Sequence, residues 1–337
     1  MTEEPLFRRS PFSDPTNDVW RFFDLKRKSK TLDASTDLLF SAQTHLSLRV
    51  TKTGLMSEEL LAGVVLSEVV SDGWVSPLPQ TDSAQSHPHR YQIDLSACDV
   101  PHISVALFFE EEQSLVELVW KDAAPSRAME LAIGGRTPLC VVRNVFHLPT
   151  QSKRSFVLTP HVSSEGVCTI HEHLHLGERA LFQSIYHTNA THGITRCIRL
   201  AELKEGATVR FETRGEIGTG ASWQEVSDLS HIGPCSHSVV RVRTVCHDQG
   251  QLICQSLARL GRGVVNAKTD EQIAVLLLNG KPDVRLRPFL SIEHDVVEGA
   301  HGASIGGVSE ASLLYLFSRG ISREIAVNLL KQAFLES

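Results

Sequence analysis

ATVRFETRGE (residues 207–216) alternates apolar and polar side chains, as a half-buried β-strand does. SVVRVRTVC (residues 238–246) repeats the pattern, and further short alternating stretches separated by glycine-containing turns extend from about residue 75 to residue 300. Residues 57–71 are the one plausible internal helix. The pattern predicts a mostly β body, and it leaves a sandwich, a barrel and a coil of β rungs open, although the lack of a clean short repeat excludes a regular hexapeptide solenoid.

Composition narrows the classes of function. The chain has 337 residues and a formal net charge of −6, so it lacks the basic footprint of a general nucleic-acid binder. No apolar run is long enough to cross a membrane, and MTEEPLFRRS at the start has no secretory signal, so we expect a cytoplasmic protein without membrane contact. Its seven cysteines form no Cys-x-x-Cys pair, which argues against a permanently bound iron–sulfur cluster on a cysteine ladder.

Near the end, HGASIGGVSEASLLYLFSRG (residues 301–320) joins a small-residue loop to a helix capped by Ser309 and closed by Gly320. A second amphipathic helix should begin after Ser322, which gives a C-terminal helical hairpin. Its residues could pack on the body or form a docking face, and the candidates for docking are Leu313, Leu314, Phe317, Arg319, Ile325, Leu329 and Phe334.

This C-terminal stretch resembles the signature of the SufB/SufD family of iron–sulfur cluster assembly scaffolds, and His-Gly-Ala at residues 301–303 is closer to the SufD branch. PFLSI (residues 288–292) and GRGVVNAK (residues 261–268) also resemble family segments. The resemblance implies a right-handed parallel β-helix. We therefore expect an N-terminal tail with a short helix over residues 1–38, a β-helix body over 39–300 and a C-terminal helical segment over 301–337.

The same resemblance implies a non-catalytic scaffold subunit that pairs with a SufB-like subunit and docks a SufC-like ABC-type ATPase. His301 would then be a candidate ligand for iron or for a transient cluster at the partner interface, although it could instead cap the last β rung. Some relatives carry a cysteine two residues earlier, where this chain has Gly299. Pairing of two copies as a homodimer is a further interpretation. Phosphate-loop and nucleophile-elbow motifs are absent from the sequence, which agrees with a protein that is not an enzyme.

One motif supports a rival hypothesis, a cupin-like metal-dependent enzyme. HEHLH (residues 171–175) places His171, His173 and His175 on one face of a strand, opposite apolar residues, and Glu178 follows. Imidazole and carboxylate groups at this spacing could share a metal ion. The match is incomplete, because Ile185 stands where the motif expects a glycine and no second metal motif follows.

Overall fold

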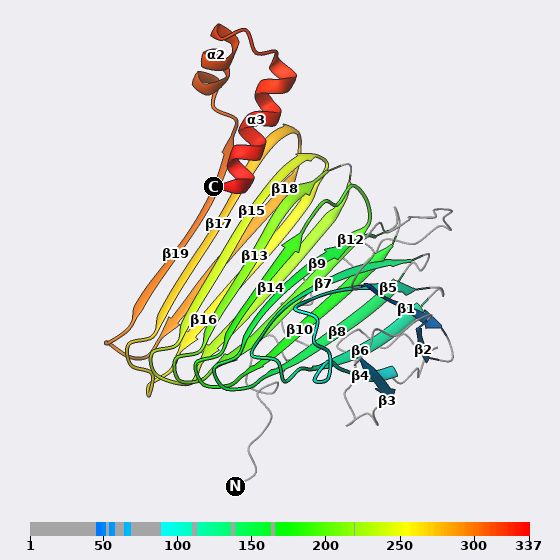
Figure 1. Cartoon of the computed structure of the whole chain (residues 1–337). Coiled ribbons are helices and arrows are strands. Elements are labelled where there is room, and N and C mark those ends of the chain that lie inside the picture. The colour runs from blue at the N-terminus through cyan, green and yellow to red at the C-terminus, as the bar shows by residue number, and fades with distance from the viewer. Residues whose placement is uncertain are drawn as a thin grey trace, which may run out of the picture.

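A computed structural model describes residues 45–51, 54–57, 64–68, 89–109, 113–135, 139–162, 166–218 and 220–337. These residues form a parallel β-helix of about seven turns, followed by two helices (Figure 1). The expectation of a mostly β protein with a parallel β-helix is confirmed. The short helix expected within residues 1–38 lies outside the described residues.

From β4 onward, successive strands alternate between two sheets, so that each turn of the β-helix contributes one strand to each sheet. The ten-stranded sheet contains β1 (His45–Thr51), β2 (Gly54–Ser57), β5 (His102–Phe109), β7 (Ser126–Gly135), β9 (Lys153–Pro160), β11 (Leu181–His187), β13 (Thr208–Ile217), β15 (His237–Asp248), β17 (Lys268–Gly280) and β19 (Glu298–Gly307). The nine-stranded sheet contains β3 (Val65–Glu68), β4 (His89–Asp94), β6 (Gln113–Lys121), β8 (Leu139–Leu148), β10 (Val167–Leu176), β12 (Ile194–Leu203), β14 (Ser222–His231), β16 (Gln251–Leu260) and β18 (Asp283–Ile292).

Pairing within each sheet is parallel, except for β1 with β2 and β3 with β4 at the N-terminal end of the described strands. The number of residues per turn varies along the coil. His171 pairs with Ile198, 27 residues later, whereas Gln255 pairs with Arg287, 32 residues later. This irregular spacing explains why the sequence shows strands but no clean repeat.

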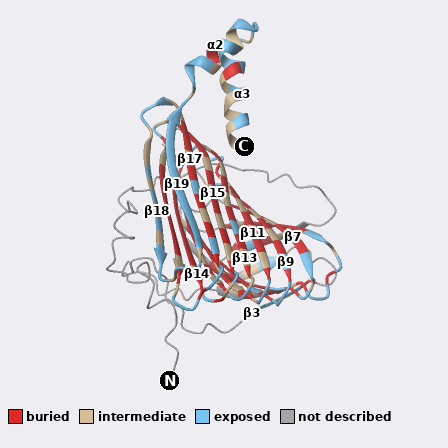
Figure 2. Ribbon diagram, turned by 90° about the vertical axis from the view of Figure 1, so that its left-hand side faces the viewer, coloured by how far each residue is buried: buried red, intermediate tan, exposed pale blue. Residues whose placement is uncertain are grey.

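The core lies between the two sheets, where every second side chain of each strand points inward. The side chain of Phe146 of β8 packs against the other sheet, and the centre of its ring lies 5.0 Å from that of Phe156 and 5.1 Å from that of Phe182. Trp223 and Phe211 are likewise fully buried. Figure 2 shows that burial is greatest in the middle strands and falls off at β18 and β19. We call the end of the β-helix formed by β18 and β19 its open end.

Two helices follow the open end, α2 (Glu310–Ser318) and α3 (Arg323–Glu336), which confirms the helical hairpin (Figure 1). The expected boundary at residue 301 is too early, because β19 runs on to Gly307 and His301 lies within a strand instead of a loop. The helix considered over residues 57–71 is also wrong where the chain is described, since Val65–Glu68 is strand β3. Neither α2 nor α3, the helices of the described chain, has the length and apolar character needed to span a membrane.

Candidate functional site

His301 lies on β19, the outermost strand of the ten-stranded sheet, and its side chain is exposed to solvent. β19 pairs with β17 in parallel register, with His301 directly opposite Glu271. Thr269, Glu271 and Ile273 alternate as buried residues along β17, so Glu271 points into the β-helix. Residues opposite each other in a sheet project to the same face, and His301 therefore projects to the interior side at the open end.

Gly299 gives independent support for this direction. It precedes His301 by two residues, so any side chain at residue 299 would project to the same face as His301. A Cβ atom built on Gly299 would lie 2.8 Å from Cδ2 of Leu290 and 3.0 Å from Cδ1 of Ile292, both side chains of β18. Gly302, between His301 and Ala303, would meet nothing within 4 Å. The interior side of β19 thus carries Gly299, His301 and Ala303, and the outer side is open.

Glu271 is a carboxyl group that is fully buried directly beneath this rung. Ser256 of β16 donates a hydrogen bond of 2.7 Å to Oε1, while Oε2 has no hydrogen-bond partner within the described part of the chain. Burial raises the pKa of Glu271 to about 7, the Ser256 hydrogen bond opposes that rise, and the neighbouring carboxylate of Asp270 adds to it. No cation is among these influences, so within the described ranges Glu271 is a buried acid without a neutralising partner.

A second set of buried polar groups lies deeper in the β-helix, and we call it the interior polar cluster: Glu172, Tyr186, Arg199, Thr213 and Glu225. The guanidinium of Arg199 is fully buried, pairs with Glu225, and lies 4.6 Å from the ring centres of both Tyr186 and Phe211. Thr213 donates a 2.8 Å hydrogen bond to Glu225, and Tyr186 donates a 2.7 Å hydrogen bond to Glu172. These contacts join both sheets across the core.

The thiols of the described chain are free, and all except Cys235 are buried. Burial raises the pKa of Cys254, on the strand that carries Ser256, to about 12, with Arg199 lowering it and Glu271 raising it further. Burial also raises the pKa of Cys197 and brings that of Cys246 to about 12. Because the thiolate is the metal-binding form, these buried cysteines are poor ligands as folded.

The histidine triplet lies on β10 as a strand, with Cys168, Ile170 and Leu174 buried on the opposite face as expected. The rings pack against one another: His173 lies 4.4 Å from His175, and His175 stacks at 4.7 Å on His147. Burial is the main cause that lowers the pKa of His171 and His173 to about 3 and that of His175 to about 4, so all three are neutral at pH 7.

These groups do not form the predicted metal centre. Glu178 is exposed in the turn after β10. In the ranges that the structure describes, no three His, Cys, Asp or Glu side chains lie close enough together to hold a metal ion. The cupin-like enzyme is therefore not supported.

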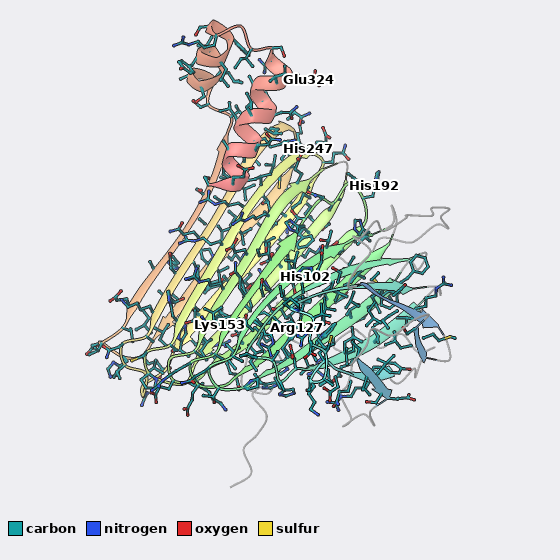
Figure 3. All side chains as sticks on the ribbon, viewed as in Figure 1. His102, Arg127, Lys153, His192, His247 and Glu324 are labelled. Carbon is teal, nitrogen blue, oxygen red and sulfur yellow. The ribbon has the colours of Figure 1, made fainter. Side chains whose placement is uncertain are left out.

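The helical hairpin is fastened to the end of the ten-stranded sheet next to β19. Lys331 of α3 pairs with Glu216 of β13 at 2.8 Å, and Arg243 of β15 donates a 2.7 Å hydrogen bond to the Ser337 hydroxyl. His247 lies at the same end of the sheet (Figure 3), with its Nε2 3.9 Å from Glu216. Ser309 caps α2 by accepting from the Ser312 N–H, and Gly320 closes it with a positive φ of 79°.

The candidate docking residues divide between packing and exposure. Leu313 is buried, Phe317 and Phe334 are half-buried, and Arg319 lies 5.4 Å from the exposed ring of Tyr315. The other three are large apolar side chains in contact with solvent: Leu314 is 65%, Ile325 55% and Leu329 43% exposed. Their role in docking remains a prediction.

Sequence reasoning selected His301, whose role stays a prediction, and did not single out the buried polar residues Glu271, Arg199 and Glu225. A charged residue at an inward position of an alternating strand was the available signal, as in the series Thr269, Glu271 and Ile273. A charged residue can be recognised as inward-facing only when the inward face of its strand is known. Polar residues at inward positions weaken the apolar and polar alternation from which that face would be identified.

Comparison with known proteins agrees with this architecture. Residues 144–334 match the model of the SufBD core domain of SUF system FeS cluster assembly. Iron-sulfur cluster assembly SufBD family proteins of Staphylococcus epidermidis, Staphylococcus saprophyticus and Staphylococcus aureus are each 25% identical to the chain over 142 residues, which is 42% of this chain and 30% of the relative. The chain thus spans 30% of the length of the curated relatives it matches. Because the family model matches more than half of the 337 residues, the chain belongs to the SufBD family of iron–sulfur cluster assembly proteins.

Proposed function

We propose that the chain is a SufD-like scaffold subunit of a SufBCD-type assembly complex in the cytoplasm, with no catalytic activity of its own. The observation that carries the proposal is the position of His301. It is exposed at the open end of the β-helix, on an edge strand that continues within three residues into the helical hairpin. In this proposal the imidazole of His301 lies between the surface that would pair with a second scaffold subunit and the surface that would dock an ATPase.

The open end supports pairing with a SufB-like subunit. All ten residues of β19 are exposed, and an exposed edge strand offers unpaired N–H and C=O groups to a partner strand. Phe289, Ile292, Val296 and Ile305 are large apolar side chains exposed around this end. Pro288 lies in β18, the outermost strand of the other sheet, and has no N–H to offer. β19 is therefore the better edge for strand addition.

The hairpin supports docking of a SufC-like ATPase. Leu314, Ile325 and Leu329 together expose apolar surface that the chain does not cover itself. Lys331 and Arg243 hold α3 against the sheet. A nucleotide-driven movement of the ATPase could therefore be transmitted through α3 to β13, β15 and the open end.

The cluster in this proposal is cargo, held transiently between subunits. His301 supplies one imidazole, and imidazole is a weaker anchor for iron than thiolate, which suits a cluster that must leave. Burial raises the pKa of Cys197, Cys246 and Cys254 and makes these thiols poor donors, so the thiolate donors would come from the SufB-like partner.

Affinity isolation from the native cell, with this chain as bait, tests the proposal. We expect a SufB-like and a SufC-like protein to be recovered with the wild-type chain. Leu314→Asp combined with Ile325→Asp should remove the ATPase and keep the scaffold partner. Arg262→Ala, at an exposed side chain remote from the hairpin in sequence, is the control. Recovery of neither protein, or of the ATPase at wild-type levels with the double variant, contradicts the assignment.

The mass of the purified chain separates the two pairing modes. A second copy could add to β19 in place of a SufB-like subunit, since a two-fold interface uses the same patch on both copies. Multi-angle light scattering of the chain alone and with the SufB-like protein tests this. A homodimer that the SufB-like protein fails to dissociate contradicts the heterodimer.

A further inference from the structure

Glu271 has an unused ligand atom. Its side chain is fully buried, Oε1 accepts a hydrogen bond from Ser256, and Oε2 has no hydrogen-bond partner among the described residues. Buried polar atoms are ordinarily satisfied, and a buried carboxyl group is usually matched by a cation or by several donors. Among the other buried carboxyl groups of the described interior, Glu225 is matched by Arg199, Thr213 and Trp223, whereas Glu172 accepts a hydrogen bond from Tyr186 and keeps one unpartnered oxygen. Glu271 has only Ser256.

Register brings this carboxyl next to His301. The two residues are direct partners in the parallel pairing of β17 with β19, and both project to the interior side. Neighbouring strands lie about 4.8 Å apart. Zinc-like divalent ions bind imidazole nitrogen and carboxylate oxygen at about 2.0–2.2 Å. A Glu and a His at paired positions can therefore hold one ion between them without a change of backbone.

The exposed residue of the pair gives a metal ion access from solvent, and the buried residue holds its ligand atom in a fixed position. His301 is exposed, so an ion can reach the imidazole from solvent at the open end. Glu271 is fixed from below by the Ser256 hydroxyl, which leaves Oε2 as the oxygen free to bind. Gly299, whose missing side chain leaves Leu290 and Ile292 uncrowded, keeps the interior side of β19 clear next to His301.

We propose that Glu271 and His301 form a divalent-metal site at the open end of the β-helix, with one imidazole nitrogen and Glu271 Oε2 as its protein ligands. The site rests on the proposed function for His301 as a ligand and for ferrous iron as the physiological ion, and Glu271 is the ligand that it adds. Two ligands leave the remaining coordination positions for water, sulfide or donors of a second subunit. A nitrogen and oxygen pair suits divalent first-row ions, and the shortage of protein ligands suits an ion that is passed on.

Cobalt(II) is the probe, because it binds nitrogen and oxygen donors and reports its ligands by visible absorption. The full-length chain, prepared without a histidine tag, is titrated with Co²⁺ at pH 7.5 by calorimetry and absorption spectroscopy. We expect Glu271→Gln to weaken the site at least about tenfold, since even outer-shell partners of a metal cost 10- to 100-fold when removed. His301→Ala should abolish it, and Glu271→Asp, which draws the carboxylate back by one methylene, should weaken it as well.

Glu172→Gln is the matched control. Glu172 is also fully buried and also has one unpartnered oxygen, but it lies on β10 of the other sheet. It should bind Co²⁺ as the wild type does, and thermal unfolding verifies that each variant is folded. Wild-type affinity in both Glu271 variants, with loss of binding only in His301→Ala, overturns the carboxylate ligand and leaves the role of His301 standing. Unchanged binding in His301→Ala overturns the site and removes the support for His301 as an iron ligand.

Discussion

Glu172 is a carboxyl group held where its charge cannot be hydrated. It is fully buried on β10, and burial raises its pKa to about 7, although Arg199 and the hydrogen bond from Tyr186 oppose the rise. The folded state therefore binds a proton more tightly than the unfolded state, whose carboxyl has the ordinary pKa of 4.5. Stability linked to this residue is complete below pH 4.5 and is lost as the pH rises through about 7.

Replacement by glutamine should remove this pH dependence, because the amide keeps the shape and an oxygen for Tyr186 but does not ionise. We expect the free energy of unfolding of Glu172→Gln, relative to the wild type, to increase by about 2–3 kcal/mol between pH 5 and pH 8. Urea unfolding at both pH values measures it. The difference between the two proteins cancels the buried histidines, which are the same in both. A pH-independent difference would mean that Glu172 is ionised throughout this range.

Single residues also show where sequence reasoning reached its limit. His301 could be selected from its small neighbours, and its exposure agrees with that choice. Glu271 could not be selected, because only the pairing of β17 with β19 places it opposite His301, 30 residues later in the chain. His171 and His173 attracted attention as metal ligands, but burial, which strand periodicity does not reveal, lowers their pKa and keeps both neutral, and the ring of His173 packs against His175.

At the scale of elements, the alternation of apolar and polar residues predicted strands that bury one face. It did not predict a strand that buries neither face. β13 and β15 bury every second residue, and their sequences show it. β19 has the sequence EGAHGASIGG and exposes all ten residues, so no buried apolar face marks it as a strand in the sequence. Its glycines suggested a loop. This strand forms because its backbone pairs with β17. Backbone hydrogen bonds do not depend on the side chains, so the sequence gives little sign of them.

An ion pair between Lys331 and Glu216 joins α3 to the ten-stranded sheet, and its loss should be measurable. Lys331 is the charged contact between α3 and the sheet, and its side chain and that of Glu216 are 20% and 34% exposed. Lys331→Ala should cost only about 0.2–1 kcal/mol of stability, as partly exposed ion pairs do. It should nevertheless speed hydrogen exchange throughout α3, since a major contact of α3 with β13 is lost.

Lys268→Ala is the control for this effect, because Lys268 forms an ion pair of similar length with Glu298, 2.9 Å between the charged atoms, although it is more exposed and does not involve the hairpin. Hydrogen exchange followed by mass spectrometry, with peptides covering residues 310–337, compares the two variants. Equal exchange of α3 in both would show that Lys331 does not hold the helix.

The whole molecule is a stack in which each rung contacts chiefly its neighbours. The rungs at its two ends therefore have fewer stabilising contacts than those in the middle. Strands such as β12 and β14 have a paired strand on either side, whereas β18 and β19 each have one within their own sheet. Stability in such a stack is approximately a sum of rung and interface contributions, so the rung that lacks one interface opens first. His301 lies on one of these terminal rungs, which have a neighbour on one side only and are expected to open more easily than the middle of the stack.

Hydrogen exchange of the isolated chain should therefore show a gradient, with the amides of β12 and β14 exchanging slowest and those of β18 and β19 fastest. Trp223→Ala, in the fully buried middle, should cost about 3–5 kcal/mol and unfold the stack as a unit. Phe289→Ala, at a side chain 46% exposed on β18, should cost much less and accelerate exchange only at the open end. Binding of a SufB-like subunit should slow exchange in β19 to the level of the inner strands. Full protection of β19 in the isolated, monomeric chain would contradict this account, because it would mean that the last rung is already completed without a partner.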